Sequence, residues 1–301
     1  MGGKRELQEW MSFGAVSLIW ASAYAMTRGA VFGDEGLPVP LVIFCRLAIG
    51  ALVLNIVMFA RGLRYPPLSD RTKWAAMLGM GFLGMTGPFF IIGIAQQTVD
   101  SSLAALYVAA TPIFIVLGAN FLFDDEKLTS RIAVGIGMGF LGVAALFGPE
   151  IYQSFGSANA TAHLLLLISA ILYASSTLLA RASPKITPLV FASGFVSLAA
   201  VMALPMLFLV EWEALSVTRG QALNVIGLGV GPSAIASILY MSLVQRSGAT
   251  FLALTGYLVP VLSAIIGFVL FREVFSWNAA FAFVLILSGV WLAQSRKLAK
   301  A

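Results

Sequence analysis

Charge is the scarcest property of this sequence. Only 10% of its 301 residues are charged, 18 of them Lys or Arg and 13 Asp or Glu, whereas 60% are apolar. A soluble domain carries about 25% charged residues, so this composition excludes one. The apolar residues come in runs of about twenty, the length that a helix needs to cross a hydrocarbon layer about 30 Å thick. We therefore expect several membrane spans.

Histidine and cysteine are almost missing as well. His163 and Cys45 are the single representatives of their types, so the chain offers neither an internal disulfide nor a metal-ligand cluster. The sequence also contains no phosphate-binding loop and no nucleophile paired with a base. We therefore expect no metal, no cofactor and no enzymatic activity. The alternative from another class is a membrane enzyme acting on lipid, which would need a cluster of His, Asp or Glu near one interface.

Ten apolar runs are bounded by charges, Pro, Gly or Trp. They cover residues 10–31, 40–60, 74–95, 100–123, 131–148, 161–181, 188–210, 223–243, 248–271 and 278–295. Several are too long and too uniformly apolar for the alternating strands of an outer-membrane barrel. The sequence predicts an all-α integral membrane protein with ten transmembrane helices. Residues 1–301 then form a single membrane transport domain, because the short connections leave no room for a soluble one.

Basic residues are distributed unevenly between the predicted loops. With a cytoplasmic N-terminus, fourteen Lys and Arg lie in inner tails and loops, and only Arg219 and Arg272 lie in outer loops. Positively charged loops face the cytoplasm, so both termini are expected there and the number of spans is even. The net charge of +5 therefore marks orientation in a lipid bilayer. We expect no nucleic-acid partner and no obligate soluble partner.

The second half of the sequence resembles the first. Matching positions, in chain order, are Trp20 with Tyr173, Arg28 with Arg181, Pro88 with Pro232, Pro112 with Pro260, and Glu126 with Glu273. This collinear series predicts two repeats, at about residues 8–150 and 159–297. Five helices per repeat is an odd number, so the second repeat crosses the membrane in the opposite direction. Such inverted repeats allow two halves to exchange conformations, which favours transport by alternating access.

The same positions carry a likeness to a known family. The run Ser17–Ser22 with Arg28 resembles the first-helix pattern of EamA-type members of the drug/metabolite transporter superfamily, and Arg46 in the second span also fits. Both copies of a Pro, Glu and Gly-Val pattern fit too, at Pro112, Glu126 and Gly142-Val143, and at Pro260, Glu273 and Gly289-Val290. The resemblance implies ten helices in two inverted repeats, a bacterial inner-membrane location and export of small metabolites. Bacterial aromatic amino-acid exporters are one such branch.

No carboxylate lies inside a predicted span. All thirteen acidic residues fall in tails, in loops or at span ends. A buried carboxylate that gains and loses a proton is the simplest device for proton-coupled export, and buried charges in membranes usually mark function. We therefore expect a carrier without a buried carboxylate proton site.

Aromatic and hydroxyl side chains inside the spans form the candidate substrate site. Trp20 is the only Trp at a span midpoint, and it begins a stripe on one helix face that matches a stripe from Tyr173 in the second repeat. The candidate substrate-binding residues are Trp20, Ser22, Tyr24, Arg46, Tyr107, Thr111, Tyr173, Ser176, Thr177, Tyr240 and Tyr257. The alternative for each is packing in the bundle core.

Such a cavity suits an amphipathic, net-neutral small-molecule substrate, for example an aromatic or other bulky amino acid. Nucleosides or drugs are the alternative within transport. Arg46 is either a contact for a substrate carboxylate or a structural arginine satisfied by carbonyl groups. Arg28 and Arg181, near opposite membrane faces, are expected to extend toward the lipid headgroups.

Helix ends and bends complete the sequence predictions. Four prolines within spans occur as matched pairs and are candidate hinges of a gating motion, or else static kinks: Pro88, Pro112, Pro232 and Pro260. Glu126 and Glu273 precede the last helix of each repeat, where a carboxylate favours the positive end of the helix dipole. We expect each to cap that helix.

Overall fold

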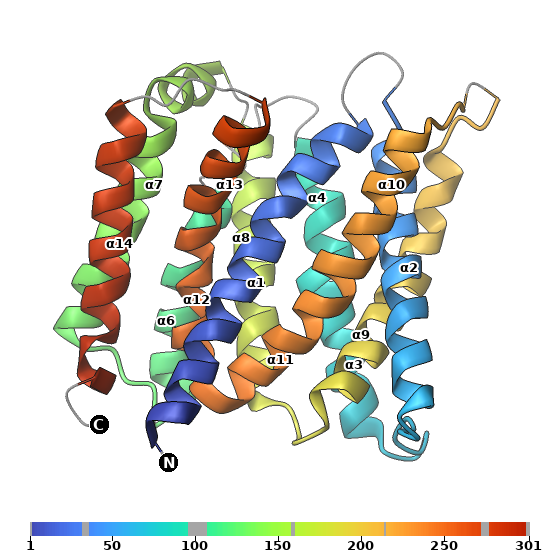
Figure 1. The fold of residues 1–301 in the computed structure, drawn as a ribbon, viewed down its shortest axis with the longest axis horizontal. Coiled ribbons are helices and arrows are strands. Elements are labelled where there is room, and N and C mark those ends of the chain that lie inside the picture. Colours follow the sequence, from blue (N-terminus) through green and yellow to red (C-terminus); the bar gives the residue numbers. More distant parts are fainter. Residues whose placement is uncertain are drawn as a thin grey trace.

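The computed structural model is a helical bundle, with no strand in the part of the chain that it describes. That part comprises residues 2–31, 36–95, 107–157, 160–213, 215–271 and 277–298. Helix α1 (Gly2–Val31) begins, and helix α14 (Trp277–Leu298) ends, at the same end of the bundle, the lower end in Figure 1. We call it the termini end. The opposite end is called the far end.

The helices follow the apolar runs of the sequence closely. In the first half they are α2 (Val39–Ala60), α3 (Arg71–Gly81), the π-helical η1 (Phe82–Thr86), α4 (Gly87–Ala95), α6 (Thr111–Leu122) and α7 (Ser130–Ser157). In the second half they are α8 (Ala160–Ala182), α9 (Pro188–Ala203), the 3-10 helix η2 (Leu204–Leu209), α10 (Arg219–Leu228), the π-helical η3 (Gly229–Ile235), α11 (Ala236–Ser247), α12 (Ala249–Ala253) and α13 (Thr255–Phe271).

Within the described residues, five continuous helical stretches are long and apolar enough to cross a membrane. They are Val39–Ala60, Arg71–Ile92, Thr161–Ala182, Pro188–Leu209 and Arg219–Ser247. Shorter apolar helices occupy Tyr107–Leu122, Ser130–Ala145, Ala249–Ser263 and Phe281–Ala293. The all-helical membrane fold expected from composition is thus confirmed.

Local sequence explains where several helices begin. Pro188 is the first residue of α9, where its fixed φ suits the helix and its missing N–H costs nothing. At α10, the Thr218 hydroxyl accepts from the Gln221 N–H while the Gln221 side chain accepts from the Thr218 N–H, which forms a capping box. The Asp70 carboxylate caps α3 by accepting from the Lys73 N–H. These caps hold the loops at the two ends of the bundle.

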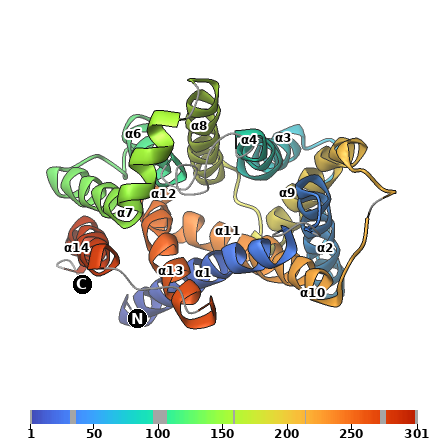
Figure 2. The same cartoon turned by 90° about the horizontal axis from the view of Figure 1, so that it is seen from above.

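The helix pair α7 and α14 lies at one side of the bundle, as the view from above shows (Figure 2). Small residues allow the two backbones to meet, because a Cβ on Gly135 would lie 2.6 Å from the Gly289 carbonyl oxygen. Gly135 on α7 and Gly289 on α14 therefore permit close contact between the two helices. Helices α2, α9 and α10 gather at the opposite side, with α1, α8 and α11 between (Figure 2).

The matched prolines behave as two distinct pairs. Pro88 directly follows the start of α4 after η1, and Pro232 lies inside η3, so both members of this pair adjoin a π-helical segment. Such segments are frequent at functional sites. Pro112 instead occupies the first turn of α6, where no backbone hydrogen bond is lost, and Pro260 lies inside α13. Pro88 and Pro232 therefore mark the distorted helices.

Candidate functional site

Arg46 on α2 is a part-buried cation with weak compensation. Its Nε donates to the Ser233 hydroxyl at 3.3 Å, and its guanidinium carbon lies 4.8 Å from the centre of the Phe89 ring. Within the described residues, no carboxylate forms an ion pair with it. One hydroxyl and one ring face compensate a desolvated charge only in part. A guanidinium has five N–H donors, so Arg46 has donors to offer a ligand.

The two neighbours of Arg46 each follow a proline of the pair Pro88 and Pro232, which the sequence matches between its two halves. Phe89 directly follows Pro88 in α4, shortly after η1, and Ser233 directly follows Pro232 inside η3. Arg46 thus connects the two distorted helices. Sequence reasoning missed both residues, although the matched prolines were a signal that pointed to the positions after them.

A second group of contacts surrounds Tyr240 on α11. Its ring centre lies 5.9 Å from that of Trp20, and its hydroxyl donates to the Thr177 hydroxyl at 3.1 Å. Ser176, also on α8, is buried and meets η1 closely, because a Cβ on Gly84 would lie 2.6 Å from its oxygen. These contacts bring four of the predicted site residues together, namely Trp20, Ser176, Thr177 and Tyr240.

Helix α8 joins the two groups. Tyr173 lies within electrostatic range of Arg46, and one turn later Thr177 donates to the Tyr173 carbonyl at 3.2 Å. We call the combined set the central cluster; it consists of Trp20, Arg46, Phe89, Tyr173, Ser176, Thr177, Ser233 and Tyr240. Its side chains combine one cation, aromatic faces and hydroxyl groups, drawn from both halves of the chain.

Other predicted site residues lie elsewhere. The Tyr107 hydroxyl lies 3.0 Å from Nδ1 of His163 near the start of α8. The Tyr257 ring packs against α7, because a Cβ on Gly139 would lie 2.5 Å from it. Ser22 donates to the carbonyl of Ile19 within its own helix at 2.8 Å. These three make their recorded contacts outside the central cluster.

Two of the predicted site residues carry a buried hydroxyl that finds no partner among the described residues. They belong to Thr111 at the start of α6 and to Tyr257 on α13. The side chain of Tyr24, the remaining candidate, lies outside the described residues. Its backbone continues α1 one turn beyond Trp20.

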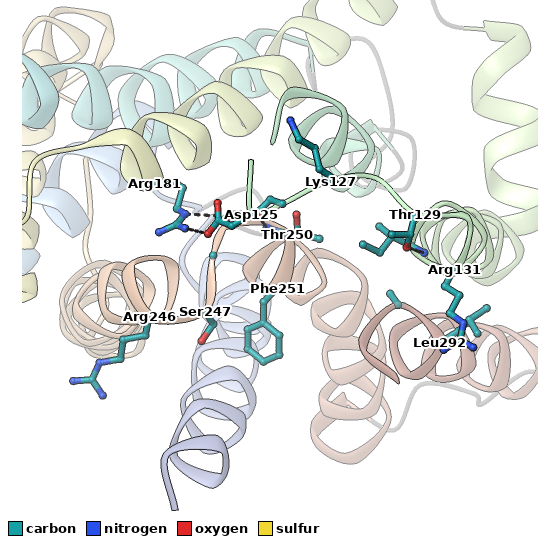
Figure 3. A pocket seen from close by; sticks show the side chains of 14 residues that line it. Asp125, Lys127, Thr129, Arg131, Arg181, Arg246, Ser247, Thr250, Phe251 and Leu292 are labelled. Atoms are coloured by element: carbon teal, nitrogen blue, oxygen red, sulfur yellow. Dashed lines mark hydrogen bonds and ion pairs between the residues drawn. The ribbon is translucent and has the colours of Figure 1, made fainter. Parts of the chain in front are cut away.

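Glu126 is the most fully bonded acid in the described chain. One carboxylate oxygen accepts from the Ala249 N–H at 2.8 Å and from Arg181 Nε at 3.0 Å, and the other accepts from the Thr250 N–H at 2.6 Å. Arg181 also pairs with Asp125, as the dashed lines in Figure 3 show. Glu126 therefore ties together the loop before α7, the end of α8 and the start of α12. We call this contact the junction.

Gly248, between α11 and α12, allows the junction to form. Its φ of +92° favours glycine, and a Cβ there would lie 2.5 Å from the Glu126 carboxylate. The junction corrects two predictions. Glu126 caps α12 of the second half, whereas α7, the helix that it was expected to cap, begins only at Ser130. Arg181 is ion-paired with two acids and does not extend freely toward headgroups. Glu273 and the side chain of Arg28 lie outside the described residues.

Comparison with known proteins places the chain in a family. The model of the EamA-like transporter family matches residues 10–148 and again residues 160–294. The uncharacterized inner membrane transporter YedA of Escherichia coli strain K12 is 28% identical over 296 residues, covering 94% of this chain and 91% of YedA. A probable terminal-alkyne amino-acid exporter of Streptantibioticus cattleyicolor is 26% identical over 287 residues, covering 93% of this chain and 91% of the relative.

Two further matches agree with this placement. The uncharacterized transporter YoaV of Bacillus subtilis strain 168 is 22% identical over 284 residues, covering 92% of this chain and 94% of YoaV. A protein of known crystal structure superposes with a TM-score of 0.81 at 25% identity, covering 95% of this chain and 97% of that one. The chain belongs to the EamA-like transporter family, within the drug/metabolite transporter superfamily, and is a multi-pass membrane transporter.

Proposed function

We propose that the protein is a secondary carrier that exports small net-neutral metabolites across the bacterial inner membrane by alternating access. The proposed substrates are aromatic or other bulky amino acids. The observation that carries this proposal is Arg46, a part-buried cation beside aromatic rings and hydroxyls with no carboxylate partner in the described chain. The family relative named as a probable amino-acid exporter supports the substrate class.

The chemistry of the central cluster matches an amino acid. A substrate carboxylate accepts hydrogen bonds from Arg46, which completes the compensation that Ser233 and Phe89 leave unfinished. A bulky side chain packs against Trp20 and Tyr240, whose rings lie 5.9 Å apart. One cation balances one carboxylate, so a dianion such as a sugar phosphate is disfavoured.

The proposed topology has ten spans in two inverted five-helix repeats. The two separate matches to one family model, at residues 10–148 and 160–294, support an internal duplication. The helix ends in Figure 1 support an even number of spans, since α1 begins and α14 ends at the same end of the bundle. The excess of basic residues in loops at that end favours a cytoplasmic location for it.

Alternating access then requires a contact that closes the cytoplasmic end. The junction has the geometry of such a contact, because Glu126 from the first half holds Arg181, Ala249 and Thr250 from the second half. We assign the bending to η1 and η3, where Pro88 and Pro232 already interrupt regular α-helical hydrogen bonding. Separation of the junction opens the cytoplasmic side to the central cluster.

The decisive experiment uses the purified full chain in liposomes. Uptake and counterflow of labelled amino acids, nucleosides and sugars are measured with and without a pH gradient. We expect counterflow of aromatic or other bulky amino acids, with little acceleration by the gradient. Counterflow of nucleosides or sugars alone would contradict the substrate class, and strong acceleration by the gradient would contradict a carrier without a proton site.

A further inference from the structure

We propose that Ser233 is a positioning residue, which holds Arg46 in the orientation that binds a substrate carboxylate. Arg46 lies on α2, and Ser233 lies inside η3 in the other half of the chain. The inference rests on the proposed function, because it concerns the same contact between Arg46 and the substrate. It goes further by naming the residues that decide how well this contact forms.

Two contacts fix the guanidinium group of Arg46. Its Nε donates to the Ser233 hydroxyl at 3.3 Å, which fixes one edge of the planar group. The centre of the Phe89 ring lies 4.8 Å from the guanidinium carbon, so the ring packs against the cation. Because Ser233 occupies Nε, the N–H groups of the two Nη atoms are left to contact a ligand. Two such donors match the two oxygens of a carboxylate.

The Ser233 hydroxyl reaches Arg46 because α2 and η3 pack with little side chain between their backbones. A Cβ on Gly50 of α2 would lie 2.8 Å from the Ser233 Cβ and 3.1 Å from the Gly229 carbonyl oxygen. A Cβ on Gly229, the first residue of η3, would lie 2.5 Å from Ile49 and 3.2 Å from the Arg46 carbonyl oxygen. Glycine at both positions lets the two segments approach, and this approach brings Ser233 to Arg46.

The alternative role of Ser233 is that of a small residue, which only allows α2 and η3 to meet. Its side chain is fully buried, at 0% exposure, so its hydroxyl needs a partner inside the protein. Alanine is smaller than serine and lacks the hydroxyl. Ser233→Ala would therefore preserve a role in spacing but abolish a role in positioning Arg46.

The place of Ser233 inside η3 connects this contact to the proposed motion. We assign the bending of the carrier to η1 and η3, and Phe89 lies shortly after η1. Movement of η3 away from α2 therefore withdraws the Ser233 hydroxyl from Nε, and Arg46 loses the orientation that suits a carboxylate. Substrate affinity then depends on the conformation of the carrier, which is how a ligand and a conformational change are coupled.

The test compares phenylalanine with its decarboxylated amine, phenethylamine, in counterflow by the purified full chain in liposomes. Leucine and isopentylamine form a second pair without an aromatic ring. Two variants disturb the contact in different ways. Ser233→Ala removes the hydroxyl, and Gly50→Ala pushes η3 away from α2 without changing either Arg46 or Ser233.

Each variant has a matched control outside the central cluster. Ser193→Ala removes another fully buried serine hydroxyl, which donates to the Leu189 carbonyl in its own helix at 2.8 Å. Gly142→Ala introduces a comparable clash between α7 and α14, because its Cβ would lie 2.5 Å from Ile286. Thermal unfolding in detergent compares the stability that Gly50→Ala and Gly142→Ala lose.

We expect the wild type to prefer phenylalanine over phenethylamine. Ser233→Ala should raise the phenylalanine concentration for half-maximal counterflow about fivefold, which corresponds to one lost hydrogen bond. The maximal rate and the half-maximal concentration of phenethylamine should stay unchanged. Gly50→Ala should lower the preference in the same way, whereas Gly142→Ala should lose similar stability and keep the wild-type preference. Ser193→Ala should keep it as well.

A wild-type preference in Ser233→Ala would overturn the inference, as would equal losses of preference in Gly50→Ala and Gly142→Ala. If Gly50→Ala does not fold, the result for Ser233→Ala decides. Arg46→Gln separates this failure from a failure of the proposed function. A preference that depends on Arg46 but not on Ser233 would contradict only the positioning role. A wild type without preference in either pair would contradict both proposals.

Discussion

Arg46 and Arg181 are two partly buried arginines with opposite surroundings. Arg181 meets two carboxylates, from Asp125 and Glu126, and its side chain is 24% exposed. Arg46 meets one hydroxyl and one ring, and within the described chain no carboxylate. A charge removed from water must be compensated. Within the described chain, carboxylates of the protein compensate Arg181 but not Arg46. We conclude that Arg181 has a role in the protein's own closure, whereas Arg46 is suited to meet a charge that the substrate brings.

The first way to test this contrast is to remove Glu126. Glu126→Ala leaves Arg181 with only Asp125 and frees the N–H groups of Ala249 and Thr250. Removing one partner of a buried ion pair costs about 3 kcal/mol of unfolding free energy. Thermal unfolding in detergent measures the loss. Glu9→Ala removes an acid outside the junction and serves as the control; an equal loss in both variants would contradict the role of the junction.

Arg46→Gln should impair transport with little effect on stability. A hydrogen bond to a charged group is worth about 1.5 to 3 kcal/mol, so the rate of amino-acid counterflow at low substrate should fall about 10- to 150-fold. Arg181→Gln should instead lower the stability of the protein more than Arg46→Gln does, and should change substrate affinity less. A wild-type rate for Arg46→Gln at equal reconstitution would contradict substrate binding.

Gly248→Ala tests the fit of the junction, with Gly62→Ala as its matched control. Both glycines have positive φ, +92° and +68°, so both variants suffer backbone strain of about 1 to 2 kcal/mol. Only at Gly248 does the new Cβ meet Glu126, whereas no atom lies within 4 Å of it at Gly62. Unfolding free energies should therefore fall further for Gly248→Ala. Equal losses would show that the carboxylate moves aside without cost.

Tyr240→Phe should have a smaller effect at the central cluster. The change removes the hydroxyl that donates to Thr177 at 3.1 Å but keeps the ring beside Trp20. We expect a loss of about 1 kcal/mol, seen as a rise of about fivefold in the substrate concentration for half-maximal counterflow. Trp20→Phe, which shrinks the ring and keeps the hydroxyl bond, separates packing from hydrogen bonding. No change in either variant would place the substrate elsewhere.

The partly exposed pair of Asp70 and Lys73 should give the smallest effect. The hydrogen bond from the Lys73 side chain lowers the pKa of the Asp70 carboxyl below its ordinary value, and the two groups lie 2.7 Å apart. A lowered pKa stabilises the fold at pH values above about 3.9, the ordinary aspartate value, and this stability disappears as pH falls through the lowered value. Asp70→Asn should remove that dependence in thermal unfolding between pH 3 and pH 7. If Asp70→Asn left the pH profile of thermal unfolding unchanged, the proposed contribution of the Asp70–Lys73 pair to stability would be contradicted.

Much of the fold follows from the sequence because its causes are local. Runs of apolar residues predict the helices directly. Pro188 acts on the backbone at the start of α9, and the glycines of α7 allow close contact with a neighbouring helix. The central cluster was partly predictable for the same reason, since Tyr173, Ser176 and Thr177 share one helix.

The junction was not predictable from local patterns. Glu126 and Ala249 are 123 residues apart, and a carboxylate before α7 satisfies the ordinary pattern of a cap for that helix. The contact of Tyr257 could not be predicted either, because the sequence around it in α13 does not reveal that its ring meets Gly139 on α7. Contacts between distant segments decide both roles.

The most direct measurement compares an amino acid with its decarboxylated amine in counterflow. The amino acid exchanged fastest by the wild type is tested against that amine, in liposomes that contain the wild type or Arg46→Gln. Because Arg46 is proposed to bind the carboxylate, the wild type should exchange the amino acid at least about tenfold faster, and Arg46→Gln should lose most of this preference. An Arg46→Gln carrier that keeps both the wild-type rate and the wild-type preference would contradict the proposed site.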